Sequence, residues 1–194
     1  MVLLQIKDLM FKKGLFKKKT ILNNINITLK KGEIIAVYGR TASGKTALLN
    51  IVSGLLSPSS GTVEENGVCS YATQEFLLYE DLTVDENIDF ACESNNFHHK
   101  DKKAFIERLG LKGWEKVRAS QLPEGLRKML QIACAFSKEF DFILLDEPIL
   151  GLDYVLSKTV WTMMNETAAS GKGVLLTTST EDDISHCKNI YRLD

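Results

Sequence analysis

A glycine-bounded segment near the start of the chain combines residue types that bind phosphate groups. Residues 39–46 read Gly-Arg-Thr-Ala-Ser-Gly-Lys-Thr, which matches the P-loop pattern G-x-x-x-x-G-K-S/T between an apolar run and a helical segment. We expect backbone N–H groups of this loop and of the helix start to surround phosphate oxygens. Lys45 would neutralise β and γ oxygens, and the Thr46 hydroxyl would ligate Mg²⁺. The predicted nucleotide-binding residues here are Gly39, Arg40, Thr41, Ala42, Ser43, Gly44, Lys45, Thr46 and Ala47.

Two adjacent carboxylates follow a second apolar run. Residues 142–145 are Phe-Ile-Leu-Leu, and Asp146 and Glu147 come directly after them. This position is the carboxyl end of a predicted strand, where open α/β sheets bind their ligands. We expect Asp146 to hold Mg²⁺ through water and Glu147 to polarise the water that attacks the γ-phosphate.

The elements that must position these residues alternate between strands and helices. Apolar runs and alternation predict strands at residues 2–7, 25–29, 33–38, 141–145 and 173–177, and helices at 47–53 and 154–170. Between residues 83 and 138, apolar residues recur at helical spacing. We therefore expect one α/β domain with a P-loop NTPase core (residues 1–75 and 140–194). Its sheet would be mostly parallel, with an N-terminal antiparallel β portion and an inserted all-helical subdomain at residues 76–139.

Composition narrows the class of protein. The 194 residues are 44% hydrophobic, enough for one sizeable core, and the formal net charge of −1 gives no indication of a nucleic-acid partner. The four cysteines are widely spaced and form no Cys-x-x-Cys pair, which fits a reducing compartment. No apolar stretch approaches the roughly 20 residues needed to span a bilayer, so we expect any membrane crossing to be made by another chain.

Three further segments occur at a spacing that one family explains. Gln74 lies in Tyr-Ala-Thr-Gln-Glu (residues 71–75), residues 82–87 read Leu-Thr-Val-Asp-Glu-Asn, and Gly-Leu-Asp at 151–153 follows the acidic pair. Together with the P-loop, these segments resemble the Q-loop, the opening of the helical subdomain and the D-loop of ABC-transporter nucleotide-binding domains. The likeness covers nearly the whole chain.

The resemblance implies roles for several residues. The nucleotide would be ATP with Mg²⁺, and Gln74 would contact the Mg²⁺ and γ-phosphate region and relay its state toward a membrane subunit. Asp153 would lie across a dimer interface, and it would also cap the helix that begins near residue 154. The family's adenine-stacking aromatic is assigned to Phe16 by its distance to Leu22, whereas Phe11 fits less well.

Two departures from the family pattern concern catalysis. The signature L-S-G-G-Q is replaced by Leu-Pro-Glu-Gly-Leu at residues 122–126, which keeps Gly125 as a predicted nucleotide contact. Pro123 lacks a hydroxyl and an N–H, and Glu124 places negative charge where a partner's γ-phosphate would arrive. Ser179 stands at the position of the family's switch histidine, where it can donate a hydrogen bond but cannot become a cation.

We therefore expect an ATP-binding and hydrolysing subunit, cytoplasmic and peripheral on the cell membrane, that powers a separate integral membrane transporter subunit. A second ABC ATP-binding domain would complete it, as a homodimer or as a heterodimer with a more complete cassette. The altered signature and the serine leave open a regulatory or immunity module that acts mainly by binding a partner, with slow or no turnover. A DNA-repair or translation-factor ATPase is disfavoured because no long coiled-coil insertion and no second cassette is present.

Overall fold

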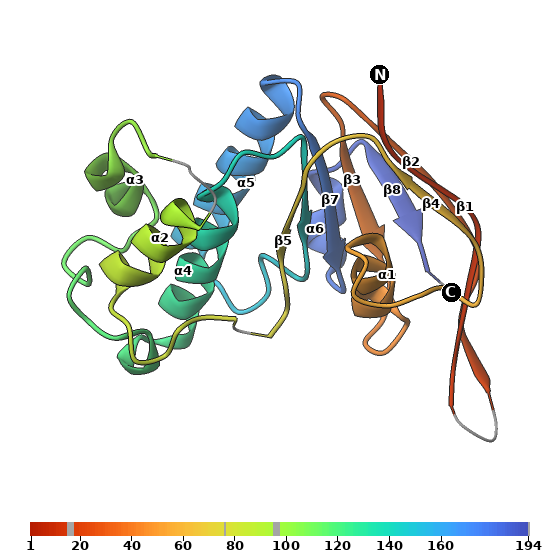
Figure 1. The fold of residues 1–194 in the computed structure, drawn as a ribbon, viewed down its shortest axis with the longest axis horizontal. Coiled ribbons are helices and arrows are strands. Elements are labelled where there is room, and N and C mark those ends of the chain that lie inside the picture. Colours follow the sequence, from red (N-terminus) through yellow and green to blue (C-terminus); the bar gives the residue numbers. More distant parts are fainter. Residues whose placement is uncertain (15–17, 76, 95–97, 194) are drawn as a thin grey trace.

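Two β-sheets form the frame of the fold in the computed structural model, which describes residues 1–194 except 15–17, 76, 95–97 and 194 (Figure 1). The antiparallel sheet has the order β2-β1-β4, with β1 (Val2–Lys13), β2 (Lys19–Lys30) and β4 (Ser60–Glu65). The second sheet has the order β5-β6-β7-β3-β8, and its paired strands are all parallel. Its strands are β3 (Ile34–Tyr38), β5 (Cys69–Ala72), β6 (Phe142–Leu145), β7 (Gly173–Thr178) and β8 (Asn189–Arg192).

Helices cover the parallel sheet and form a separate cluster. They are α1 (Lys45–Val52), α2 (Val84–Glu93), α3 (Lys102–Arg108), the 3-10 helix η1 (Ala119–Gln121), α4 (Glu124–Phe136), α5 (Tyr154–Ala169) and α6 (Glu181–Ser185). Helices α2, α3 and α4 lie on the side of the molecule away from β1, β2 and β4 (Figure 1). This arrangement agrees with the predicted parallel core, antiparallel N-terminal portion and helical insert.

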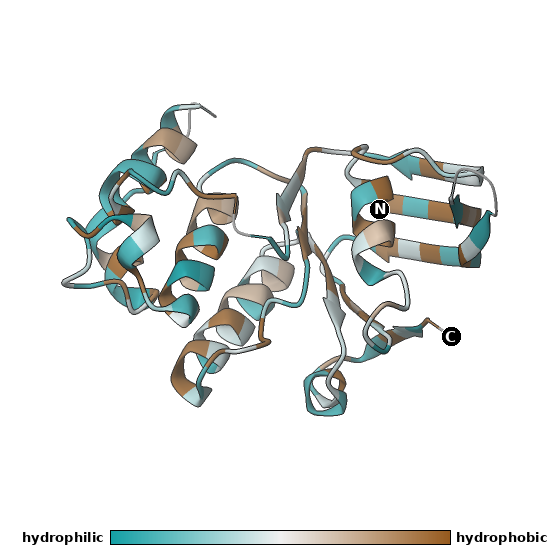
Figure 2. Cartoon of the chain, turned by 90° about the horizontal axis from the view of Figure 1, so that it is seen from below, coloured by the Kyte–Doolittle hydropathy of each residue, from teal (hydrophilic) through white to brown (hydrophobic). Residues whose placement is uncertain are grey.

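Strands β1 and β2 of the antiparallel sheet bury one face each against α1 and the parallel sheet. Along β2, Leu22, Ile25, Ile27 and Leu29 are buried while their neighbours are mostly exposed, and Figure 2 shows the resulting alternation of apolar and polar bands. These side chains share a core with residues of α1 and with one face of β6 and β7. Helix α1, which begins within the P-loop, is therefore fixed between two sheets.

The other face of the parallel sheet packs on α4 and α5, and α2 packs on α4 as part of the same core. All residues of β6 and β7 are buried, as expected for strands of a parallel sheet with both faces covered. Helix α2 begins at a capping box in which the Thr83 hydroxyl accepts from the Glu86 N–H while the Glu86 carboxylate accepts from the Thr83 N–H. Helix α4 shares this second core through Met129, Leu130 and Ala133.

The strands differ from the sequence prediction in length and number. Residues 2–7 and 25–29 were expected as strands, but β1 and β2 continue outward until Lys13 pairs with Lys19. Backbone pairing in a hairpin does not require apolar side chains, so apolar alternation underestimates such strands. Strands β4 and β8 have mostly exposed side chains and carry no apolar pattern.

Candidate nucleotide-binding site

The P-loop connects the end of β3 to the start of α1, and glycine is required at two of its positions. A Cβ on Gly39 would lie 2.3 Å from Ser43 Oγ, and a Cβ on Gly44 would lie 2.8 Å from the Leu22 side chain. Gly44 also has φ of 101°, in the left-handed region that favours glycine. The loop therefore packs so closely on β2 that a side chain at position 44 would clash with Leu22.

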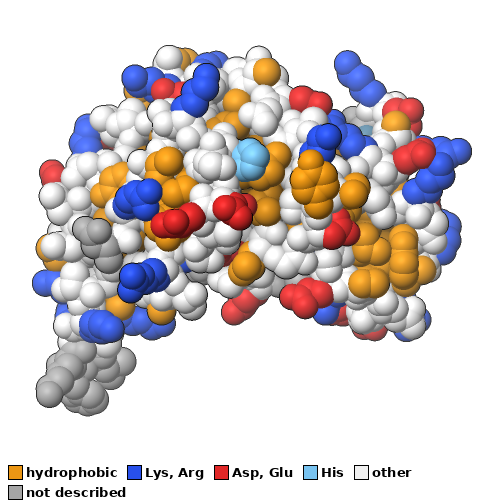
Figure 3. Space-filling view, turned by 180° about the vertical axis from the view of Figure 1, so that it is seen from behind, with side chains coloured by type: hydrophobic (Ala, Val, Ile, Leu, Met, Phe, Trp, Pro, Cys, Tyr) orange, Lys and Arg blue, Asp and Glu red, His pale blue; other side chains and the backbone are white. Residues whose placement is uncertain are grey.

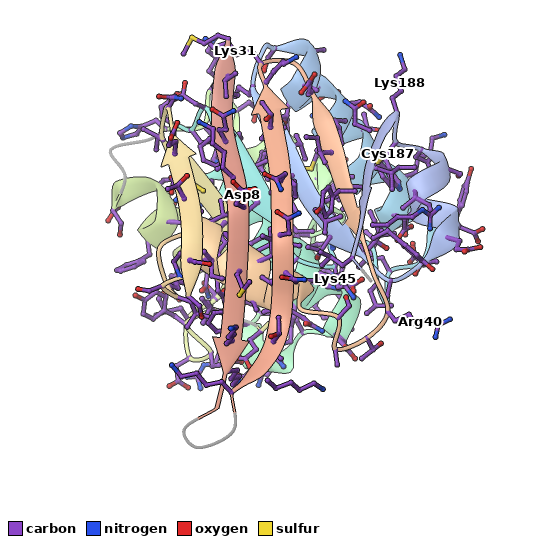
Figure 4. All side chains as sticks on the ribbon, turned by 90° about the vertical axis from the view of Figure 1, so that its right-hand side faces the viewer. Asp8, Lys31, Arg40, Lys45, Cys187 and Lys188 are labelled. Atoms are coloured by element: carbon purple, nitrogen blue, oxygen red, sulfur yellow. The ribbon has the colours of Figure 1, made fainter. Side chains whose placement is uncertain are left out.

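Lys45, the first residue of α1, lies inside the loop. Its ammonium donates to the carbonyl oxygens of Gly39 (2.6 Å) and Arg40 (3.0 Å), and the side chain is almost fully buried. The Lys45 Nζ also lies 3.2 Å from Glu147 Oε1. In Figure 4, Lys45 lies beside β2, whereas the exposed Arg40 points outward. The loop thus holds a buried cation at a helix N-terminus, an arrangement suited to phosphate oxygens.

Oxygen donors gather on the side of Thr46. The Thr46 hydroxyl donates to Gln74 Oε1 at 3.3 Å, which brings residues of α1 and the segment after β5 together. Asp146 is buried at the end of β6, and its Oδ2 has no hydrogen-bond partner among the described residues. A buried carboxylate oxygen without a partner is costly unless a ligand completes it. Hydroxyl, amide and carboxylate oxygens are the ligands that Mg²⁺ prefers, so this donor set fits the predicted ion.

Glu147 is held from three sides. Its Oε1 faces Lys45, and its Oε2 accepts from the Ser179 N–H (3.1 Å) and hydroxyl (3.2 Å). The backbone of Glu147 has φ of 49°, which is unfavourable for a residue with a Cβ. The Thr177 hydroxyl accepts from the Glu147 N–H (3.0 Å) and donates to Asp146 Oδ1 (2.5 Å), so one hydroxyl orients both acidic residues.

Thr177 is a site residue that the sequence interpretation missed. It is fully buried in β7, next to β6 in the sheet. The available signal was a pair of threonines at the end of an otherwise apolar strand, at the same edge as the two carboxylates. Ser179, two residues further on, was predicted and does reach Glu147.

A cavity of about 490 Å³ is lined by several of these groups, whereas Asp146 and Thr177 lie outside its lining. The predicted residues that line it are Thr41, Ala42, Gly44, Lys45, Thr46, Ala47, Gln74, Glu147 and Ser179. Phe11, Lys13 and Ile21 of the antiparallel hairpin line the same cavity. Phe16, the predicted adenine-stacking residue, lies outside the described residues, whereas the aromatic ring of Phe11 is available in the cavity wall.

Comparison with known proteins assigns the chain to a family. A family model described as ABC transporter matches residues 22–150. The chain belongs to the ABC transporter family. It is 29% identical over 184 residues to the probable multidrug ABC transporter ATP-binding protein YbhF of Escherichia coli (strain K12), a match that covers 87% of this chain and 32% of YbhF. The chain thus spans about a third of the length of that relative.

Two further similarities cover more of the matched protein. The thiamine import ATP-binding protein ThiQ of Brucella abortus is 32% identical over 179 residues, which is 84% of this chain and 74% of ThiQ. A solved structure of an ATP binding subunit of an ABC transporter superposes with a TM-score of 0.88 at 25% identity, covering 98% of this chain and 85% of the other. The fold is therefore that of the family's ATP-binding domains.

Among the described residues, five predicted nucleotide contacts of this ABC domain lie outside the cavity lining, namely Gly39, Arg40 and Ser43 of the P-loop, Asp153 and Gly125. Asp153 caps α5 by accepting from the Leu156 N–H at 2.9 Å, which confirms the predicted N-cap. Gly125 lies in the first turn of α4, where Pro123 is the N-cap residue and makes no side-chain capping bond. Contacts from Asp153 and Gly125 to a nucleotide held by a second ABC domain stay predictions.

Proposed function

We propose that the chain binds ATP with Mg²⁺ and hydrolyses it, and that this activity powers a separate membrane-spanning transporter protein. The observation that carries the proposal is the single cavity where Lys45, Thr46, Gln74 and Glu147 meet. Phosphoryl transfer depends mainly on positioning and electrostatic stabilisation, and these four side chains supply a cation, two oxygen donors for the metal and a base.

The positions of the side chains support a separate role for each in ATP binding and hydrolysis. Lys45 would exchange the two P-loop carbonyls for phosphate oxygens, which also separates it from Glu147. Thr46 and Gln74 would hold Mg²⁺ together with Asp146, through water in the case of Asp146; the bound ion would neutralise charge on the phosphates. The carboxylate of Glu147 would accept a proton from the attacking water while Ser179 keeps it oriented.

An exposed apolar patch supports a protein partner close to Gln74. Leu77 and Tyr79 follow the Gln74 segment, and Phe90 of α2 stacks edge-on against Tyr79 with ring centroids 4.5 Å apart. Their exposed fractions are 70%, 52% and 45%, which is unusual for large apolar side chains grouped together. We assign this patch to the membrane-spanning partner, because Gln74, the proposed contact to Mg²⁺ and the γ-phosphate, lies shortly before it in the chain.

The membrane partner is proposed as a separate chain. Among the described residues, no helix is long and apolar enough to cross a membrane. The name of the Brucella relative describes an import ATP-binding protein, and we carry over to this chain the role of ATP-binding subunit without its substrate. On the face drawn in Figure 3, basic and acidic side chains are interspersed rather than separated by sign, which supports a partner other than nucleic acid. The proposed location is the cytoplasmic face of the cell membrane.

A second ABC ATP-binding domain is proposed to complete each site. Leu150, Tyr154 and Val155, which surround Asp153, are 48%, 80% and 69% exposed. An apolar surface around the residue predicted to reach across the interface supports association of two domains. The partner domain is either a second copy or a different chain with an unaltered signature.

Two observations favour the alternative of a regulatory module with little turnover. Glu147 is paired with Lys45 and bonded to Ser179, and Glu124 is exposed at the start of the altered signature helix. In that case ATP would bind and change the partner-binding surface without rapid hydrolysis.

Single-turnover measurements of ATP hydrolysis distinguish the transporter subunit from the regulatory module. With Mg-ATP and the membrane protein that co-purifies with the chain, we expect hydrolysis that Glu147→Gln slows by about a hundredfold without loss of ATP affinity. Glu139→Gln, the same change at an exposed site, should match the wild type. ATP binding with no hydrolysis at any partner concentration would favour the regulatory module, and absence of ATP binding would contradict both functions.

A further inference from the structure

Helix α4 contacts the two loops that carry the catalytic groups. Lys128 and Gln131 are three residues apart on α4 and therefore project from neighbouring positions of one helix face. The ammonium of Lys128 donates to the carbonyl oxygens of Glu147 (2.8 Å) and Leu150 (2.5 Å). Gln131 Nε2 donates to Thr73 Oγ1 and to the carbonyl of Glu75, on the two sides of Gln74.

The contact from Lys128 holds a turn that is otherwise strained. Glu147 has φ of 49°, and the bond from the Leu150 N–H to the Glu147 carbonyl in this turn is long, at 3.3 Å. Lys128 draws both carbonyl oxygens of this turn toward one cation, and hydrogen bonds from a charged donor are the stronger kind. Burial lowers the pKa of the Lys128 ammonium, and the negative charges of Glu147, Glu124 and Asp146 oppose this decrease only in part.

The contact from Gln131 holds the segment of Gln74. Gln131 is 6% exposed, and its amide bonds to the side chain of Thr73 (2.9 Å) and to the backbone of Glu75 (2.6 Å). Gln74 lies between these two anchor points and accepts from the Thr46 hydroxyl. Displacement of the 73–75 backbone would therefore move a predicted Mg²⁺ ligand.

We propose that Lys128 and Gln131 are positioning residues for ATP hydrolysis, and that together they set the separation between Glu147 and Gln74. Both side chains come from one helix, α4. The positions of Glu147 and of the Gln74 amide are therefore both fixed relative to α4. Neither side chain lines the nucleotide cavity. The inference rests on the proposed function, because Glu147 and Gln74 are given their catalytic roles there.

Substitutions that remove the donors without removing bulk test the proposal. In Lys128→Met we expect kcat for ATP hydrolysis to fall by about tenfold to a hundredfold, because small misplacement of a reacting group has effects of this size, with KM for ATP changed by less than about threefold. Lys128→Arg keeps a charged donor and should recover most of the rate. Lys158→Met, the same change at an exposed lysine of α5, is the matched control and should behave as the wild type.

Substitution of Gln131 should have a different effect from substitution of Lys128. Gln131→Met should weaken Mg²⁺ binding by about tenfold, measured by calorimetry with a non-hydrolysable ATP analogue, because outer partners of metal ligands have effects of this size. Lys128→Met should leave Mg²⁺ affinity unchanged and should instead speed hydrogen exchange of the amides in residues 147–152. A general loss of stability would change both readouts in both variants and would overturn the proposal.

The outcomes separate this proposal from the proposed function. Wild-type rates and unchanged exchange in Lys128→Met, or unchanged Mg²⁺ affinity in Gln131→Met, would overturn it. If Lys128→Met does not fold, Lys128→Gln, which keeps a neutral donor, replaces it and should give an intermediate rate of hydrolysis. A wild-type rate in Lys128→Gln together with unchanged Mg²⁺ affinity in Gln131→Met would also overturn the proposal. If the wild type itself hydrolyses no ATP, the proposed function fails, while the exchange and Mg²⁺ measurements still decide whether α4 holds the two loops.

Discussion

The ammonium of Lys45 lies 3.2 Å from a carboxylate oxygen of Glu147, and both side chains are only 6% exposed. The pair joins the P-loop to the residue after the second apolar strand, so the expected phosphate ligand and the expected base neutralise each other in this structure. ATP phosphates would compete with Glu147 for the same cation. Binding of nucleotide would thereby be linked to release of Glu147, the proposed base.

Lys45→Ala should weaken Mg-ATP binding by about tenfold to a hundredfold, because hydrogen bonds between charged groups contribute about 1.5–3 kcal/mol. It should also lower the free energy of unfolding by about 3 kcal/mol, because the buried Glu147 carboxylate loses its partner. Calorimetry and urea unfolding measure the two effects. Lys31→Ala removes the same charge at an exposed position and is the control. Unchanged ATP affinity in Lys45→Ala would remove the P-loop assignment.

Ser179→His should raise the hydrolysis rate by about tenfold, because an imidazole can carry the positive charge that the serine lacks near the γ-phosphate. Ser179→Ala is the matched comparison: it removes one of the two Ser179 bonds to Glu147 and should lower the rate by about threefold to tenfold. Single-turnover measurements in the presence of the partner give both rates. If the histidine variant is no faster, the altered signature limits turnover rather than Ser179.

Pro123→Ser combined with Glu124→Gly should increase ATP-dependent association of two domains. The change supplies a hydroxyl and an N–H at the start of α4 and removes an exposed carboxylate. Stability of the monomer should change little, because a serine N-cap contributes about 1 kcal/mol and a glycine in place of Glu124 costs about 1 kcal/mol. Sedimentation of a Glu147→Gln background loaded with ATP tests this. An unchanged dimer fraction would mean that residues 122–126 do not contact nucleotide across an interface.

The buried carboxyl group of Asp183 should make the free energy of unfolding depend on pH. Burial raises the pKa of its carboxyl group, the Glu147 charge adds to this increase, and the hydrogen bond from Thr178 and the charge of His186 oppose it. A group with a raised pKa in the folded state stabilises the fold below its unfolded pKa, and the contribution is lost as pH rises through the folded value. Asp183→Asn should therefore gain stability relative to the wild type as pH rises from about 4. Urea unfolding at several pH values measures the difference, and a difference that stays constant with pH would contradict the assignment.

Much of the site could be predicted from the sequence because its parts are local. The P-loop is a contiguous run whose glycines, lysine and threonine have meaning at fixed spacing, and Asp146 and Glu147 are adjacent at the end of an apolar strand. The alternation of apolar strands and helices likewise predicted the parallel core and the helical insert. Strands β4 and β8 could not be predicted, because pairing with neighbours rather than an apolar face holds their largely exposed residues in place.

The tertiary structure alone decided which distant side chains meet. Thr177 is next to both carboxylates because β7 pairs with β6, and Lys128 reaches Glu147 because α4 packs beside that turn. Phe11 lines the nucleotide cavity together with Ile21 of β2, because β1 pairs with β2 so that Phe11 lies opposite Leu22. Such contacts depend on strand order, register and helix packing, which bring together residues far apart in the chain, whereas the P-loop pattern is a contiguous run that can be read from the sequence.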